Sequence, residues 1–235
     1  MSKQTAWAVV PAAGIGSRMR ADRPKQYLDL DGMTVIEHTL QRLASHPDIK
    51  AIVVSIAEND PWWHEVSLPE NAEIHVVTGG AERADSVLNA LIALSDIADG
   101  NDWVLVHDAA RPCLRNQDIT TMLQELSEHK VGGILGVPVS DTVKRADTQN
   151  GIVETVERKG LWRASTPQMF RLQILKEALQ QSKSNGLAVT DEASAIELTG
   201  LQPVMVEGHA DNIKITVPQD LALASLFLKQ QGGNI

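Results

Sequence analysis

The sequence predicts an α/β fold in which helices cover both faces of a mostly parallel sheet. Along the first half of the chain, short and continuously apolar runs alternate with segments whose apolar residues recur at helical spacing. Strands that are buried on both faces have such runs, and strand–helix alternation is typical of parallel sheets. With 235 residues, the chain is also long enough to bury a sizeable core.

The expected elements follow one another along the chain. The apolar runs predict strands at Trp7–Val10, Ala51–Ile56, Glu73–Val77, Trp103–Val106, Gly133–Val137 and Pro203–Val206. Helical spacing predicts helices at Thr34–Ala44, Ala84–Leu94, Gln117–Glu128, Leu172–Gln181, Glu192–Leu198 and from Pro218 onward. Thr34 is the expected N-cap of its helix, because Glu37 stands three residues later, as in a capping box.

The segment from Ser140 to Lys159 has a different character from the rest of the chain. It is polar, and it carries Asn150-Gly151 between two runs typical of strands, a strong hairpin signal. We therefore expect one domain over residues 1–235, with a hairpin arm at about 139–160. Such an arm has little core of its own, so we expect it to pack on a second subunit. A mobile surface excursion is the alternative.

Composition limits the classes of function. The net charge of -9, from 21 basic and 30 acidic residues, argues against binding to nucleic acid or to an anionic membrane. Aromatic residues make up 3% of the chain, too few for a base-stacking platform. The single cysteine, Cys113, fits a reducing cytoplasm. The polar start at Met1–Thr5 does not resemble a signal peptide, and no apolar run approaches the roughly 20 residues that span a bilayer.

Ligands bind beyond the carboxyl ends of parallel strands, so the segment after the first strand is a candidate site. It contains Gly14, Gly16 and Arg18, with Lys25 a few residues further on. The glycines alone would fit an ordinary tight turn, but the two cations favour phosphate binding. The segment lacks the third glycine of a dinucleotide fingerprint, and it does not match a P-loop.

Two further strand ends carry polar residues. Gly79-Gly80 follows the third strand and permits close approach of a flat base, although a turn before a helix is the plain alternative. Asp108 follows the fourth strand, where a carboxylate meets a metal or a ribose, or else forms a local ion pair with Arg111. His107 has no second candidate ligand beside it, so we assign it to structure. The role of Arg83 stays open, with pairing to acidic residues as one possibility.

Seven separated segments carry a resemblance to a known family. They are AAGIGSRM with RPKQY (within 12–27), GGAERADSV (79–87), VLVHDAARP (104–112), DTVKR (141–145), ERKGLWRASTPQ (157–168), TDEAS (190–194) and DNIKIT (211–216). In this order they resemble the 2-C-methyl-D-erythritol 4-phosphate cytidylyltransferases of non-mevalonate isoprenoid biosynthesis. The resemblance runs from about Ala6 to Leu226. It implies the Rossmann-like, glycosyltransferase-A-like nucleotidyltransferase fold.

The resemblance also implies roles for individual residues. The expected nucleotide contacts are Pro11, Ala12, Ala13, Gly14, Gly16, Gly80, Ala81 and Ser86. The expected catalytic side chains are Arg18, Lys25, Lys214 and Arg158. The expected acceptor contacts are Asp108, Ala109, Arg111, Thr142, Arg158, Thr166, Thr190 and Lys214. Asp108 is the candidate ligand of a divalent cation such as Mg²⁺, which the phosphates mainly hold. Asp211 is expected to hold Lys214 or Lys25 in place.

The implied reaction transfers the cytidylyl group of CTP to 2-C-methyl-D-erythritol 4-phosphate. The products are 4-diphosphocytidyl-2-C-methyl-D-erythritol and pyrophosphate. The acceptor phosphate is already ionised, because its second pKa is roughly 6, so no general base is required. A homodimer is expected, in which Arg158 at the base of the arm reaches a neighbouring site. The alternatives are a sugar-1-phosphate nucleotidylyltransferase, a non-catalytic nucleotide-binding regulator and, more distantly, an NAD-dependent oxidoreductase.

Overall fold

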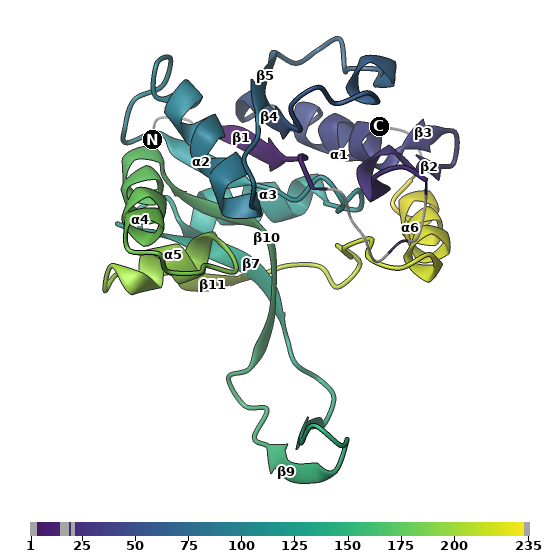
Figure 1. The fold of residues 1–235 in the computed structure, drawn as a ribbon, viewed down its shortest axis with the longest axis vertical. Coiled ribbons are helices and arrows are strands. Elements are labelled where there is room, and N and C mark those ends of the chain that lie inside the picture. The colour runs from purple at the N-terminus through teal and green to yellow at the C-terminus, as the bar shows by residue number, and fades with distance from the viewer. Residues whose placement is uncertain (1–3, 15–18, 20–21, 233–235) are drawn as a thin grey trace.

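A seven-stranded sheet forms the centre of the computed structural model, which describes residues 4–14, 19 and 22–232 (Figure 1). The strand order is β11-β7-β10-β6-β1-β4-β5. The strands are β1 (Ala6–Pro11), β4 (Ile49–Ile56), β5 (Ile74–Thr78), β6 (Trp103–Val106), β7 (Gly132–Pro138), β10 (Trp162–Arg171) and β11 (Val204–Glu207). All neighbouring pairs are parallel except those of β10, which runs antiparallel to both β6 and β7. The predicted mostly parallel α/β fold is confirmed.

Helices cover both faces of this sheet. They are α1 (Val35–Ala44), α2 (Arg83–Leu94), α3 (Asn116–Glu125), α4 (Leu172–Ser184) and α5 (Glu192–Leu198), whereas α6 (Gln219–Gln230) packs with Leu30 and Val35 in a separate buried cluster. Side chains of α1 and α3 pack with Ala8 and Val10 in one buried cluster, whereas α2, α4 and α5 pack with Val9 in another. Successive β1 side chains thus point to opposite faces, which explains the continuous apolar run of the strand.

Most of the predicted boundaries hold to within a few residues. Thr34 caps α1 in a capping box with Glu37, as the spacing predicts. Helix α3 ends at Glu125 rather than at Glu128, and α4 continues to Ser184 rather than ending at Gln181.

Within the central sheet, β10 is the strand that the sequence did not predict. Its first four residues are half-buried or exposed, and Pro167 interrupts the sequence pattern, so it has no continuous apolar run. In the structure, β10 fills the space between β6 and β7, and Gln168 pairs with Val106.

Short elements complete the described chain. The strands β2 (Asp29–Leu30) and β3 (Met33–Thr34) form a small hairpin beside α6, and 3-10 turns span Lys25–Tyr27 and Trp63–Glu65. Trp62 stacks on Tyr27 and, with Trp63, packs against the core. Within the described residues, no helix combines the length and apolarity that a membrane crossing requires.

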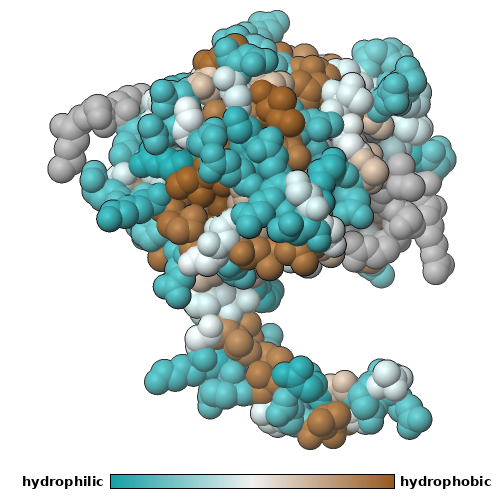
Figure 2. All heavy atoms as spheres, turned by 60° about the vertical axis from the view of Figure 1, so that its left-hand side comes forward, coloured by the Kyte–Doolittle hydropathy of each residue, from teal (hydrophilic) through white to brown (hydrophobic). Residues whose placement is uncertain are grey.

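The segment between β7 and β10 projects away from the sheet as an arm (Figure 1). Strands β8 (Val143–Ala146) and β9 (Ile152–Val156) pair in antiparallel fashion, and Asn150 has the positive φ of 65° that its turn requires. Figure 2 shows apolar side chains along this arm, which stands apart from the body of the molecule. Ile152 is 70% exposed and Val153 is 62% exposed, so the arm leaves apolar surface in solvent.

Candidate active site

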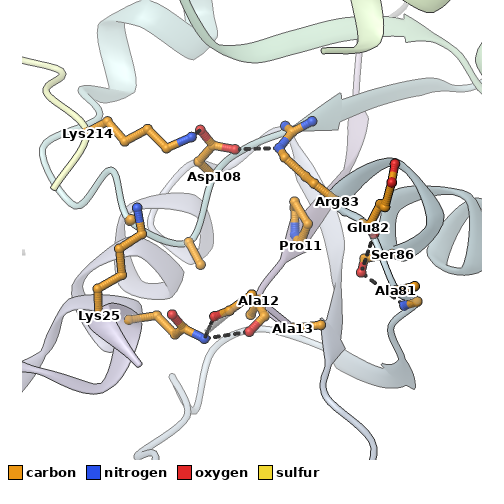
Figure 3. Close-up of a pocket in the computed structure, with 15 residues that line it drawn as sticks. Pro11, Ala12, Ala13, Lys25, Ala81, Glu82, Arg83, Ser86, Asp108 and Lys214 are labelled. Atoms are coloured by element: carbon orange, nitrogen blue, oxygen red, sulfur yellow. Dashed lines mark hydrogen bonds and ion pairs between the residues drawn. The ribbon is translucent and has the colours of Figure 1, made fainter. Parts of the chain in front are cut away.

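The ends of β1, β5 and β6 meet at one edge of the sheet and enclose a cavity. It is lined by Pro11, Ala12, Ala13, Gly14, Lys25, Gln26, Gly80, Ala81, Glu82, Arg83, Ser86, Asp108, Ala109, Ala110 and Lys214. In Figure 3, Lys25 and Lys214 lie on one side of the cavity, and Ala81 and Ser86 lie on the other. The structure therefore brings together residues from all three predicted segments and from the late Lys214 segment.

The loop after β1 is held by a side chain, Gln26, for which the sequence pattern predicted no role. Gln26 is buried, and its Nε2 donates to the carbonyl oxygens of Ala12 (2.6 Å) and Gly14 (3.0 Å). With two carbonyls turned toward Gln26, the loop backbone has a fixed orientation beside the cavity. Gly16 and Arg18, predicted for the same loop, lie outside the described residues.

The loop after β5 packs directly against the loop after β1. A Cβ atom on Gly79 would lie 2.5 Å from the Cβ of Ala13, so only glycine allows this approach. The hydroxyl of Ser86 accepts from the amide of Gly80 (3.0 Å) and donates to the carbonyl of Glu82 (3.2 Å). Ser86 thus shapes the glycine loop, in addition to lining the cavity.

Asp108, at the end of β6, is surrounded by cations. Its Oδ1 accepts from Arg83 Nε at 2.9 Å, and its Oδ2 lies 2.8 Å from Lys214 Nζ and 3.6 Å from Arg111 Nε. Burial raises the pKa of this carboxyl, but Arg83 and Lys214 outweigh burial and hold the pKa well below its usual range. Both carboxylate oxygens are already engaged, so Asp108 is poorly suited to ligate a metal in this arrangement.

A second buried carboxylate completes the cluster. Glu192, in the first turn of α5, accepts from Arg83 Nη1 (2.6 Å) and Nη2 (3.1 Å). Arg83, whose role the sequence left open, therefore bridges two acids. The three cations Arg83, Arg111 and Lys214 face two carboxylates, which leaves one excess positive charge beside the cavity.

The segment 211–216 carries Lys214 to the cavity. Lys25 Nζ donates to the carbonyl of Ile215 at 2.8 Å, so the two lysines are linked through this segment. The prediction that Asp211 holds Lys214 or Lys25 is wrong. Asp211 accepts instead from Arg115 Nε at 3.0 Å and from Gln231, because its side chain faces those residues.

Two predicted acceptor residues stand behind the cavity wall. The Thr166 hydroxyl accepts from the amide of Asp108 (3.0 Å) and lies 3.1 Å from His107 Nδ1. The other ring nitrogen of His107 is 3.0 Å from the carbonyl of Arg111, whose guanidinium reaches the carbonyl of Asn212. His107 is fully buried, and burial lowers its pKa to about 4, which supports the structural role expected for it.

The remaining predicted residues lie further from the cavity. Thr190 lines a small neighbouring cleft. Arg83 lies between the two, because it lines both this cleft and the candidate-site cavity. Thr142 lies at the start of the arm, and Arg158 lies at its base, where its guanidinium bonds to the carbonyl of Ser140. The described part of one chain thus leaves Thr142 and Arg158 outside its own cavity.

The sequence matches the family described as IspD, 2-C-methyl-D-erythritol 4-phosphate cytidylyltransferase, over residues 6–230. The chain belongs to this family. It is 53% identical to the enzyme of that name from Vibrio vulnificus (strain YJ016) over 224 residues, which cover 95% of this chain and 94% of the relative. It is 54% identical to the one from Pseudomonas aeruginosa (strain UCBPP-PA14) over 216 residues, which cover 92% of each.

Solved structures of the same family share the fold. The crystal structure of the Francisella tularensis 2-C-methyl-D-erythritol 4-phosphate cytidylyltransferase superposes with a TM-score of 0.82 at 39% identity, covering 96% of this chain and all of that one. The structure of the enzyme from Thermus thermophilus gives 0.77 at 29% identity, covering 97% of this chain and all of that one. The resemblance read from the sequence is therefore confirmed, and the chain is a nucleotidyltransferase of isoprenoid precursor biosynthesis.

Membership in this cytidylyltransferase family gives the cavity a chemical meaning. Transfer of a cytidylyl group builds negative charge on phosphate oxygens, and fixed cations stabilise such charge. Lys25 and Lys214 provide two amino groups from segments far apart in sequence, which the fold brings to the same side of the cavity. The arrangement suits phosphoryl chemistry driven by positioning and electrostatics.

Proposed function

We propose that the cavity at the ends of β1, β5 and β6 is the site where this family member transfers the cytidylyl group of CTP. The acceptor, 2-C-methyl-D-erythritol 4-phosphate, attacks the α-phosphorus through a phosphate oxygen. A phosphorus–oxygen bond forms to the acceptor as the bond to pyrophosphate breaks. The acceptor oxygen is already anionic at neutral pH, since its second pKa is roughly 6, so no side chain needs to remove a proton.

The residues of the cavity divide this work between two sides. The backbone of Ala12, Ala13, Gly80 and Ala81 is proposed to read the cytosine, and Ser86 holds that loop in shape. Lys25 and, from outside the described residues, Arg18 are proposed to hold the triphosphate. Lys214 lies opposite the glycine loop and is proposed to meet the acceptor phosphate (Figure 3). The observation that best supports this assignment is that Lys25 and Lys214 line the same cavity as the glycine loop.

We propose that a divalent cation such as Mg²⁺ is held mainly by phosphate oxygens of the nucleotide. Asp108 is the expected protein ligand, but Arg83 and Lys214 already occupy its two oxygens. Among the described residues, no group of three or more His, Cys, Asp or Glu side chains is arranged to hold a metal. The residues that the structure describes therefore do not form a dedicated metal site by themselves. The roles given to side chains here do not depend on one.

We further propose that the arm joins two copies of the chain, which form one catalytic assembly. The arm leaves Ile152 and Val153 exposed and carries Thr142 and Arg158 away from the cavity of their own chain. A second subunit would cover the apolar surface and receive Arg158 beside its acceptor site. A cytoplasmic location is also proposed, for which the free, buried thiol of Cys113 is suitable.

The proposal is tested by incubating the full chain with CTP, Mg²⁺ and 2-C-methyl-D-erythritol 4-phosphate and measuring pyrophosphate release. We expect turnover with CTP and weak or no turnover with UTP, GTP or ATP. Release of pyrophosphate only with UTP or GTP and a sugar 1-phosphate would contradict the proposal. Absence of turnover with every nucleotide and acceptor would favour a non-catalytic nucleotide-binding protein.

A further inference from the structure

Glu192 is a buried carboxylate for which the reaction described above has no use. Its side chain is 1% exposed, in the first turn of α5, yet it carries a charge rather than an apolar group. Burial of a carboxylate is unfavourable unless the group is paired and hydrogen-bonded. Its two oxygens accept from Nη1 and Nη2 of Arg83, at 2.6 and 3.1 Å. Glu192 therefore fixes the plane of the Arg83 guanidinium.

The third nitrogen of the same guanidinium acts on the cavity. Arg83 Nε donates to Asp108 Oδ1 at 2.9 Å, while Asp108 Oδ2 holds Lys214 Nζ at 2.8 Å. An unbroken chain of charge-assisted contacts thus runs from Glu192 to Lys214. Only the planar, forked guanidinium can serve two carboxylates at once with defined geometry.

Glu192 itself is rigidly placed relative to Asp108. Gln168 on β10 accepts from the amide of Ala193 (2.9 Å) and donates to Asp191 (2.9 Å), which caps α5. Gln168 also pairs in register with Val106 on β6, two residues before Asp108. One strand therefore ties the first turn of α5 to the end of β6, and the distance from Glu192 to Asp108 is set by the sheet.

The charges show why Glu192 matters for the cavity. Burial opposes the charged form of Arg83, but Glu192 and then Asp108 outweigh burial and raise its pKa above the ordinary arginine value. Without Glu192, Asp108 would be the only carboxylate paired with the charge of Arg83. Arg83 would then compete with Lys214 for Asp108. The guanidinium would also lose the contact that sets its orientation.

We propose that Glu192 is a positioning residue, which acts through Arg83 and Asp108 to fix the ammonium group of Lys214 for the acceptor phosphate. This inference rests on the proposed function, in which Lys214 meets the acceptor. Glu192 touches neither substrate, and its effect is expected on the acceptor rather than on CTP.

The test compares kcat and both KM values of the wild type with those of Glu192→Gln. The glutamine keeps the size of the side chain but removes its charge. We expect the KM for 2-C-methyl-D-erythritol 4-phosphate to rise about tenfold, as loss of a charge-assisted contact typically produces. The KM for CTP should stay within about twofold, and far-UV circular dichroism should be unchanged. Glu197→Gln, on the same helix but exposed, is the matched control and should behave as wild type.

A double-mutant cycle with Arg83→Lys separates positioning from simple stability. Lysine keeps the charge but cannot contact both acids, so neutralising Glu192 in this background should add no further increase in the acceptor KM. Additive effects would overturn the proposal, as would wild-type constants in Glu192→Gln. A lower concentration of active enzyme in Glu192→Gln, with both KM values unchanged, would also overturn the proposal. Failure of the proposed function is distinguishable, because wild-type enzyme would then show no turnover in the same assay.

If Glu192→Gln does not fold, Glu192→Asp provides the second variant, because it retains the charge on a shorter side chain. We expect it to fold and to raise the acceptor KM by less than tenfold. A CTP KM that rises as much as the acceptor KM in this variant would overturn the assignment of Glu192 to the acceptor side.

Discussion

Asp108 and Lys214 show how one residue controls another across the cavity. Asp108 is buried yet charged, because Arg83 and Lys214 outweigh the cost of burial and depress its pKa. The contact between Asp108 Oδ2 and Lys214 Nζ, at 2.8 Å, also holds Lys214 beside the cavity. A carboxylate at this strand end thus acts as an anchor for cations, although the sequence suggested a metal ligand.

Lys25 is the first residue with a sharp prediction. Its amino group reaches the cavity while donating to the carbonyl of Ile215, and it belongs to the proposed triphosphate site. Lys25→Ala should lower kcat by at least about 10²-fold, as removal of one preorganised charge contact does. Steady-state pyrophosphate release measures this. Lys50→Ala is the control, since Lys50 pairs with Asp102 on another part of the surface. Wild-type turnover in Lys25→Ala would remove Lys25 from the mechanism.

His107 makes stability depend on pH. Its ring is buried and neutral between Thr166 and the carbonyl of Arg111, with Asp108 and the Arg111 guanidinium as its nearest charges. Burial lowers its pKa from 6.5 to about 4, so the unfolded chain binds the proton more readily. Stabilisation from the neutral ring is complete above pH 6.5 and is lost as pH falls toward 4.

We expect the free energy of unfolding to fall by up to about 3 kcal/mol over this window through His107. Urea titrations of wild type and His107→Asn at several pH values measure the difference. The variant should be less stable at pH 7.5 but should lose less stability between pH 6.5 and 4.5. Parallel curves for the two proteins would show that His107 is not the titrating group. The pKa of Asp108 is depressed, so its own stabilising contribution is lost only as the pH falls below the unfolded value near 3.8, outside this window.

At the scale of elements, β10 determines how the site is assembled. It runs antiparallel between β6 and β7, supplies Thr166 behind Asp108 and ties α5 to the sheet through Gln168. The two loops that form the nucleotide side depend instead on close contact. Gly79 lies so near Ala13 that a methyl group would not fit between them.

Gly79→Ala should therefore separate the two nucleotide loops. Its Cβ would lie 2.5 Å from Ala13 Cβ and 2.8 Å from Ser86 Oγ. Overpacking of this kind costs about 1–3 kcal/mol, so we expect the KM for CTP to rise about tenfold or more. Isothermal titration with CTP gives the same comparison without turnover. Gly100→Ala, remote from the cavity and with a milder 3.2 Å contact to Gln173, should leave CTP affinity unchanged. Unchanged CTP binding in Gly79→Ala would contradict the proposed base site.

The arm is the feature that matters for the whole molecule. It places Arg158 outside the lining of its own cavity and leaves apolar side chains exposed (Figure 2). Arg158→Ala should raise the KM for the acceptor far more than the KM for CTP. Equal effects on both substrates would contradict its assignment to the acceptor.

Subunit mixing tests whether Arg158 serves a partner's cavity. In a dimer that combines Arg158→Ala with Lys25→Ala, one site would have both an intact Lys25 and an Arg158 from its neighbour. Random pairing of equal amounts would then restore about a quarter of wild-type activity at limiting acceptor, because half of the dimers are mixed and each has one complete site. Mixing Arg158→Ala with a double variant that carries both Arg158→Ala and Lys25→Ala should restore no activity, because neither chain then supplies an intact Arg158. Activity no greater than that of the separate variants would show that Arg158 acts within its own chain.

The sequence by itself determined the parts of the fold and site that local pattern encodes. Continuous apolar runs predicted the parallel strands, Thr34 with Glu37 predicted the start of α1, and Asn150-Gly151 predicted the hairpin. Lys25 and the glycine loops were found because small residues and cations after strands are a local signal. Whether those residues have the predicted roles stays a prediction.

The tertiary structure alone decided which charges face one another. Nothing in the local pattern links Glu192 to Arg83, or Gln26 to the carbonyls of Ala12 and Gly14. Asp211 contacts Arg115 rather than a lysine, because side-chain partners follow from tertiary packing and not from spacing along the chain. Strand β10 was not predicted for the same reason. It is a strand because it pairs with β6 and β7, and it has no apolar run of its own.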